Sequence, residues 1–307
     1  MLRVKSIEFE MNGEIKMTKT SHNTVLYKTQ EVNDTTIFYR EAGMENERVL
    51  VLLHGFPTSS HMFRNLIPIL AENFHVIAPD LPGFGQTKAP KRGDFAYSFD
   101  NLTSVMEDFL KLLSFKEFAL YVFDYGAPIG YRIAMTNPES ITAIISQNGN
   151  AYLEGFGDSW GDWENYWHSP TAENREICRH FLSEEIIKNV QYLEGTNHDL
   201  VSPDGYTLDL VYLADPERQE IQLDLIGDYK SNLAVYPEFQ AYFRTFQPPL
   251  LAAWGQNDIF FVPAGAKAYK TDLPNAEIQL FDTGHFALET HVDEIADLII
   301  KFLDENL

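Results

Sequence analysis

The stretch YVFDYGAPIGYR, residues 121–132, begins like a buried strand and ends like a helix. Its first three residues favour strands, and Gly126 permits a sharp turn directly after them. Asp124 stands at the join. A carboxylate at the end of a central strand must be solvated, paired or used in chemistry. The alternative to a chemical role is simple capping of the following helix.

Strands and helices alternate on both sides of this stretch. Nearly continuous apolar runs predict strands buried on both faces. They cover residues 48–57, 74–85, 117–124, 141–149, 248–258 and 276–285. Segments with helical spacing of apolar residues separate them, and residues 99–115 are clearly amphipathic. This alternation predicts an α/β fold with a mostly parallel central sheet flanked by helices.

The pattern changes after Asn150. Residues 151–244 are rich in Trp, Tyr, Asn and acids, contain helix-like pieces, and show no buried strand. We interpret the chain as one α/β core domain, residues 24–150 plus 245–307, with a helical cap, residues 151–244, inserted after the sixth strand of the sheet, which is the one at residues 141–149. Residues 1–23 are expected to form an N-terminal extension.

The composition limits the kinds of partner. The net charge of -22 argues against nucleic acid, because phosphate binding needs a basic surface. The same charge argues against docking on anionic membranes. No stretch approaches the roughly 18 apolar residues needed to span a bilayer. We therefore expect neither nucleic acid nor membrane as a partner.

The lone cysteine, Cys178, excludes an internal disulfide, which fits a reducing compartment. Residues 1–17 contain no apolar signal-peptide core, so we expect a cytoplasmic protein. The sequence has no HExxH motif and no Cys/His cluster with metal-ligand spacing. We expect no metal and no cofactor, and no pattern indicates the oligomeric state.

Four polar residues fall at predicted strand ends, where open parallel sheets bind ligands: Asp124, Asp258, His285 and His54, of which we expect His54 to hold its loop by hydrogen bonds. Asp124 has the strand–turn–helix context of a nucleophile elbow. An ionised aspartate attacks an sp³ carbon without a base and leaves an alkyl ester. His285 would activate water to hydrolyse that ester, and Asp258 would orient His285. The backbone N–H groups of Phe56 and Tyr125 would form the oxyanion hole.

Two other positions compete for the acid that orients His285. Asp282 lies three residues before it in the same loop, but it does not end a strand. The end of the sixth strand is another common place for this acid. It holds Asn148 and Asn150, which cannot carry the charge. Both observations favour Asp258.

Five motifs occur in a characteristic order: HGFPTSSHMFRNLIP, DLPGFG, VFDYGAPIG, WGQND and TGHFALE. With them, residues 24–303 resemble the α/β-hydrolase superfamily, in the branch with an aspartate nucleophile. This branch contains the epoxide hydrolases and the haloalkane dehalogenases. The resemblance implies Asp124 as nucleophile, His285 as base and Asp258 as its acid partner. It also implies the helical cap after the sixth strand.

The two enzyme types of this branch differ in how they stabilise the leaving group. Haloalkane dehalogenases typically hold the halide with a Trp after the nucleophile and with an Asn after "HG" or a cap Trp. Here the two core positions hold Tyr125 and Phe56, which weighs against dehalogenation. Cap tryptophans remain as candidate donors, with hydrophobic packing as the alternative. They are Trp160, Trp163 and Trp167.

Epoxide hydrolases share "HGFP" and use cap tyrosines to donate a hydrogen bond to the epoxide oxygen. Among the cap tyrosines, Tyr152 and Tyr236 are favoured by their positions near the two ends of the cap. Fluoroacetate dehalogenases, which also carry "HGFP", clamp a carboxylate with arginines beside the nucleophile. Here the first arginine after Asp124 is Arg132, so that specificity is disfavoured.

The sequence thus predicts a hydrolase that works through an alkyl ester on Asp124, with a small uncharged organic molecule and water as substrates. Epoxide hydrolysis is favoured, and haloalkane dehalogenation is the alternative. A non-catalytic small-molecule binding protein on the same fold is the alternative of another class. The complete set of three polar residues argues against it, since mere binding does not need them.

Overall fold

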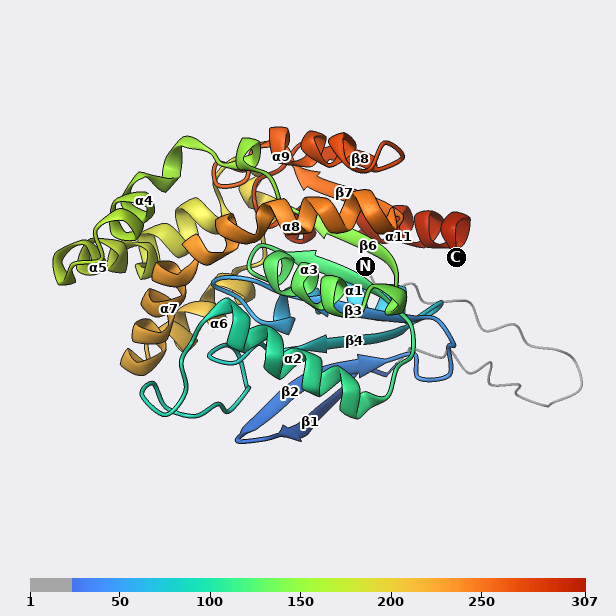
Figure 1. The fold of residues 1–307 in the computed structure, drawn as a ribbon, viewed down its shortest axis with the longest axis horizontal. Coiled ribbons are helices and arrows are strands. Elements are labelled where there is room, and N and C mark those ends of the chain that lie inside the picture. Colours follow the sequence, from blue (N-terminus) through green and yellow to red (C-terminus); the bar gives the residue numbers. More distant parts are fainter. Residues whose placement is uncertain (1–23) are drawn as a thin grey trace, which may run out of the picture.

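The computed structural model describes residues 24–307, and the predicted extension at residues 1–23 lies outside them (Figure 1). One sheet forms the centre. Its strands are β1 (Leu26–Val32), β2 (Thr35–Ala42), β3 (Val49–Leu53), β4 (His75–Pro79), β5 (Phe118–Phe123), β6 (Ile141–Gln147), β7 (Leu250–Gly255) and β8 (Glu277–Phe281). Their order is β1-β2-β4-β3-β5-β6-β7-β8. β1–β2 and β2–β4 are antiparallel and all other pairs are parallel, which confirms the predicted sheet.

The strands differ in burial according to their place in the sheet. All residues of β5 and β7 are buried, because helices cover both faces at the centre. Their continuous apolar runs made them easy to predict. β1 pairs only with β2, and its residues alternate between exposed and half-buried over most of its length. This edge strand was not predicted, because LYKTQEV carries no apolar run.

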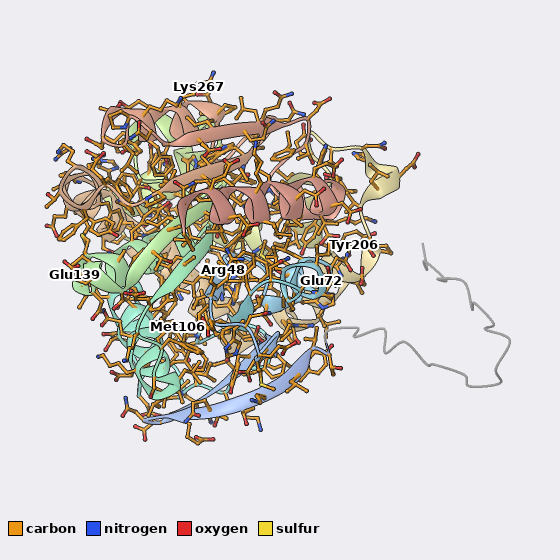
Figure 2. All side chains as sticks on the ribbon, turned by 90° about the vertical axis from the view of Figure 1, so that its right-hand side faces the viewer. Arg48, Glu72, Met106, Glu139, Tyr206 and Lys267 are labelled. Carbon is orange, nitrogen blue, oxygen red and sulfur yellow. The ribbon has the colours of Figure 1, made fainter. Side chains whose placement is uncertain are left out.

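Helices form a layer on each face of the sheet. One layer contains α2 (Phe99–Leu113), α3 (Gly126–Thr136) and part of α8 (Lys230–Phe246), and the other contains α1 (Leu66–Leu70) and α11 (Val292–Asn306). Successive residues of β3 enter opposite layers: Val51 packs with the first and Leu52 with the second. Met106 of α2 lies among the side chains that fill the first layer, whereas Glu139 and Lys267 are exposed (Figure 2).

The chain between β6 and β7 contains only helices and lies over the carboxyl ends of the strands (Figure 1). They are η3 (Leu153–Gly155), η4 (Asp158–Trp160), α4 (Gly161–His168), α5 (Ala172–Cys178), η5 (Arg179–Leu182), η6 (Glu185–Tyr192), η7 (His198–Leu200), α6 (Pro203–Leu213), α7 (Pro216–Asp228) and α8. The helical cap after the sixth strand is confirmed. Its predicted limits, residues 151–244, stay a prediction, since Phe239 and Phe243 of α8 already pack on Tyr131 of the core.

Cys178 of the cap is buried as a free thiol. The remaining helices of the core are short. These short helices are η1 (Ser60–Phe63), η2 (Pro138–Ser140), α9 (Pro263–Ala268), η8 (Tyr269–Thr271) and α10 (Ala287–Thr290). None of the helices in residues 24–307 combines the length and the apolar character that a membrane span requires.

Candidate active site

Asp124 occupies a sharp turn between β5 and α3. Its φ of +48° lies in the left-handed region, which is uncommon for a residue with a side chain. Gly126 follows so close to β3 that a Cβ on it would overlap the carbonyl oxygen of Leu53. Only glycine fits there, so the local sequence permits this tight strand-to-helix turn. The turn presents Asp124 at the carboxyl end of the sheet, in the geometry of a nucleophile elbow.

The two oxygens of the Asp124 carboxylate have different surroundings. Oδ1 accepts a hydrogen bond of 2.6 Å from the backbone N–H of Phe56. The backbone N–H of Tyr125 also donates to this carboxylate. Oδ2 faces His285, whose Nε2 lies 4.0 Å away, which is too far for a hydrogen bond. The two N–H groups predicted to form an oxyanion hole therefore converge on Asp124.

His285 is held by Asp258 on the side away from Asp124. Its Nδ1 lies 2.7 Å from Asp258 Oδ2. Asn148 Nδ2 donates to the same oxygen at 2.7 Å, and the Phe260 N–H donates to Oδ1 at 2.8 Å. Because a carboxylate only accepts, Nδ1 carries the proton in this contact, and Nε2 of the neutral ring keeps a free lone pair. That lone pair faces Asp124.

Burial and charge shift the ionisation of both groups. Burial raises the pKa of Asp124 to about 6, although His285 and the two backbone N–H groups act in the opposite direction. Burial lowers the pKa of His285, but the carboxylates of Asp258 and Asp124 outweigh it, so its pKa is raised overall. Asp124 is therefore largely ionised at neutral pH.

Other polar residues near these loops have structural partners. Asp282, the rival acid, is exposed and accepts from Asn257 Nδ2 at 3.0 Å. His54 is fully buried at the end of β3, and its Nε2 accepts from the Leu81 N–H at 2.9 Å. His54 thereby ties the loop after β3 to the loop after β4, whereas Asp282 is bound within its own surface loop.

A small cavity lies above Asp124, where the cap meets the core. The core and the cap contribute equally to its wall. The lining residues are Phe56, Asp124, Phe260 and His285 from the core, and Ser159, Trp160, Trp163 and Gln191 from the cap. The wall is largely aromatic and contains neither Lys nor Arg. Such a cavity suits a small uncharged molecule.

The three predicted cap tryptophans use their N–H groups differently. The indole of Trp160 donates to the Phe260 carbonyl at 2.9 Å, and that of Trp167 donates to the Ile226 carbonyl at 2.7 Å. Trp160 and Trp163 line the cavity, and Trp167 does not. The N–H of Trp163 has no acceptor among the described residues. Trp163 is therefore the cap tryptophan that can donate to a ligand.

The two favoured tyrosines do not line the cavity. The Tyr152 hydroxyl donates to Asp272 at 2.8 Å, and its ring packs against Tyr269. The structure thus corrects the prediction for Tyr152, since the chain turns its ring away after β6. Tyr236 is buried behind the cavity, against Phe156. Its hydroxyl lies near the hydroxyl of Tyr229 and the side chain of Asn150 but makes no hydrogen bond of good geometry among the described residues.

Tyr229 is a cap tyrosine that packs on the residues around Asp124. Its ring packs on Tyr125, with centroids 5.7 Å apart, and on the cavity residues Trp160 and Trp163. Its hydroxyl is buried beside that of Tyr236 and makes no hydrogen bond of good geometry in residues 24–307. Burial raises its pKa well above the usual value, and the Asp124 charge adds to this rise. The hydroxyl therefore stays protonated and can donate.

The α/β-hydrolase fold is the family that matches this chain, over residues 48–292. The chain belongs to this family. It is 46% identical over 284 residues to the uncharacterized hydrolase YNR064C of Saccharomyces cerevisiae, covering 91% of this chain and 97% of the yeast protein. It is 31% identical over 300 residues to a haloalkane dehalogenase of Psychrobacter cryohalolentis, covering 90% of each.

A solved structure has the same fold as this chain. Haloalkane dehalogenase DbeA from Bradyrhizobium elkani superposes with a TM-score of 0.76 at 21% identity, covering 92% of this α/β hydrolase and 100% of DbeA. At that identity the likeness concerns the fold alone. Together with the named relatives, the family membership makes this protein a hydrolase.

Three polar residues of this hydrolase's site were not predicted from the sequence. Asn148 follows a strand, the same signal that drew attention to Asp258, but its lack of charge set it aside. Tyr229 was one of many cap tyrosines without a distinguishing pattern. Gln191 gave no signal. Within residues 24–307, no three His, Cys, Asp or Glu side chains are grouped to hold a metal ion.

Proposed function

We propose that this α/β hydrolase opens small epoxides through a covalent ester on Asp124 and hydrolyses that ester with water activated by His285. One observation carries the proposal. A buried carboxylate has one oxygen bound by a backbone N–H group, while the other faces an imidazole, and the residue lines a cavity. An aspartate that only caps a helix does not need an imidazole or a cavity beside its second oxygen.

In the first step, Oδ2 of Asp124 attacks an oxirane carbon and the carbon–oxygen bond of the ring breaks. Oδ1 is already engaged by the Phe56 N–H, so Oδ2, which faces His285, is the oxygen better placed to react. The ring oxygen leaves with the electron pair and needs a donor. The buried hydroxyl of Tyr229 is suited to this role, because its pKa keeps it protonated and the neighbouring Tyr236 hydroxyl makes no hydrogen bond of good geometry with it.

In the second step, water attacks the ester carbonyl carbon of Asp124. His285 Nε2 takes a proton from that water, while Asp258 accepts from Nδ1 and stabilises the imidazolium. The negative charge that develops on Oδ1 is met by the N–H groups of Phe56 and Tyr125. Collapse of the intermediate breaks the bond to the substrate oxygen, which takes up the second proton of the attacking water. The proton held by His285 restores the Tyr229 hydroxyl, so a diol is released and the Asp124 carboxylate is regenerated. The net reaction adds one water to one epoxide.

Haloalkane dehalogenation is the second candidate, and two observations favour it. One is the sequence identity with a haloalkane dehalogenase over 90% of the chain. The other is the free N–H of Trp163 at the cavity wall. However, a halide needs several donors in a dry site, and the N–H groups of Trp160 and Trp167 are engaged by backbone carbonyls. We therefore favour the epoxide.

A matched pair of four-carbon substrates tests the choice. We expect diol formation from 1,2-epoxybutane and little bromide release from 1-bromobutane. We also expect the His285→Gln variant to accumulate a covalent adduct with 1,2-epoxybutane, visible by intact-mass spectrometry and mapped to Asp124. Bromide release without diol formation would establish dehalogenation instead. No adduct and no product from either compound would refute the ester mechanism.

A further inference from the structure

Gln191 places a polar side chain in the aromatic wall of the cavity. It is only 6% exposed and lines the cavity together with Trp163, Asp124 and His285. Its Oε1 is buried without a hydrogen-bond partner, and its amide nitrogen donates to no described residue. A buried amide that satisfies neither end costs stability, because water would satisfy both. The fold therefore holds a donor and an acceptor ready for a ligand.

A π-helix presents this side chain. η6 (Glu185–Tyr192) ends with the Leu193 N–H donating to the Lys188 carbonyl, five residues back. Ile187, Gln191 and Tyr192 are its buried residues. The last two residues of η6, Gln191 and Tyr192, are adjacent in sequence and both point inward. π-helical turns are rare and occur frequently at functional sites.

The end of η6 is fixed against the His285 loop. The Tyr192 ring stacks on Phe286 with centroids 3.9 Å apart and an angle of 10°. Gly284 approaches the Glu194 carbonyl so closely that a Cβ would overlap it. Both neighbours of His285 are thus packed on the segment that carries Gln191. The amide is consequently held in place relative to the imidazole.

We propose that Gln191 selects small epoxides that carry a hydroxyl group on the carbon next to the ring. This rests on the proposed function and narrows its substrate class. The hydroxyl would donate to Oε1 and accept from the amide nitrogen, so it satisfies both ends of the side chain. An anionic substituent is disfavoured, since the wall offers no Lys or Arg and Asp124 is itself negative.

Glycidol and 1,2-epoxybutane provide the test, because they differ only by a hydroxyl in place of a methyl group. We expect the wild type to prefer glycidol in kcat/KM. The Gln191→Leu variant keeps the size and removes both hydrogen-bonding ends. Its glycidol-to-epoxybutane ratio of kcat/KM should fall roughly ten-fold or more, mainly through the KM for glycidol. Gln191→Met serves as a second variant if Gln191→Leu does not fold.

Gln222 gives a matched control. It is 1% exposed with an unsatisfied Oε1, but it lies on α7 outside the cavity wall. Gln222→Leu should leave the ratio at the wild-type value. A ratio unchanged in Gln191→Leu and Gln191→Met would overturn the proposal while diol formation still supports epoxide hydrolysis. An equal loss on both substrates would indicate that Gln191 positions water and would also overturn it. No diol from either substrate would remove the proposed function and this proposal together.

Discussion

The Tyr229→Phe variant tests the role of the cap most directly, because it removes one oxygen atom and nothing else. The ring packs on Tyr125 and on the cap tryptophans, and phenylalanine keeps those contacts. The hydroxyl is buried beside that of Tyr236, with no hydrogen bond of good geometry to any described residue. Removing it therefore breaks no well-formed hydrogen bond of the folded chain in residues 24–307.

The structure predicts opposite effects on stability and on activity. Relief of a buried unsatisfied hydroxyl should leave the free energy of unfolding unchanged or raise it by about 1 kcal/mol. Loss of a donor to the ring oxygen should slow alkylation of Asp124 by roughly 10²-fold, the effect of removing one preorganised donor from an oxyanion site. Hydrolysis of the ester should change little, since that step uses His285 and the backbone N–H groups.

The assay is the rate of adduct formation with 1,2-epoxybutane, followed by rapid quenching and intact-mass spectrometry, alongside thermal unfolding. Tyr242→Phe is the matched control, since its hydroxyl is also buried without a described partner, and burial is the only cause that raises its pKa. The control should alkylate at the wild-type rate. Wild-type alkylation in Tyr229→Phe, or an equal loss in both variants, would show that Tyr229 does not assist ring opening.

Three further predictions concern ionisation and positioning. With the pKa of Asp124 at about 6, single-turnover alkylation should fall about ten-fold from pH 7 to pH 5, and a flat profile would contradict an ionised nucleophile. Asn148→Gly, which tolerates the φ of +45°, should slow ester hydrolysis roughly ten-fold and leave alkylation unaffected, because the lost hydrogen bonds are to Asp258, which orients His285, and to the Gly255 backbone, and none is to Asp124; equal slowing of both steps would contradict this. Burial raises the pKa of Asp209 to about 7, so its contribution to stability is greatest in acid and declines as the pH rises from about 4 to about 7. Asp209→Asn should remove up to about 3 kcal/mol of the difference in the free energy of unfolding, measured with urea, between pH 5 and pH 8. An undiminished difference would show that other groups cause it.

Strand ends were readable from the sequence because buried parallel strands leave continuous apolar runs. The polar residues that follow these runs lie at the same edge of the sheet, where the parallel strands end. Asp124, Asp258 and His285 were found in this way, and the structure brings their side chains together. The same reasoning works poorly in the cap. Its helices meet the core through tertiary packing, which sets the direction of each side chain and leaves no local pattern.

Tyr152 and Gln191 show two forms of this difficulty. Tyr152 has a suitable position in the chain, but the turn after β6 directs its hydroxyl to Asp272. Gln191 has an unremarkable position, and only a π-helical turn brings it to face the cavity. A sequence read with a helical period of 3.6 assigns such a residue to the wrong face. Both outcomes depend on backbone geometry that apolar periodicity does not report.

The ionisation of the site couples the two proposed chemical steps. Before reaction, the Asp124 carboxylate contributes to the raised pKa of His285. A protonated His285 does not impede the first step, since Asp124 attacks without a base. Formation of the ester removes the Asp124 charge, so the pKa of His285 must fall when the second step requires its neutral form. Asp258 remains charged and keeps the ring oriented. Alkylation itself thus prepares His285 to accept a proton from water.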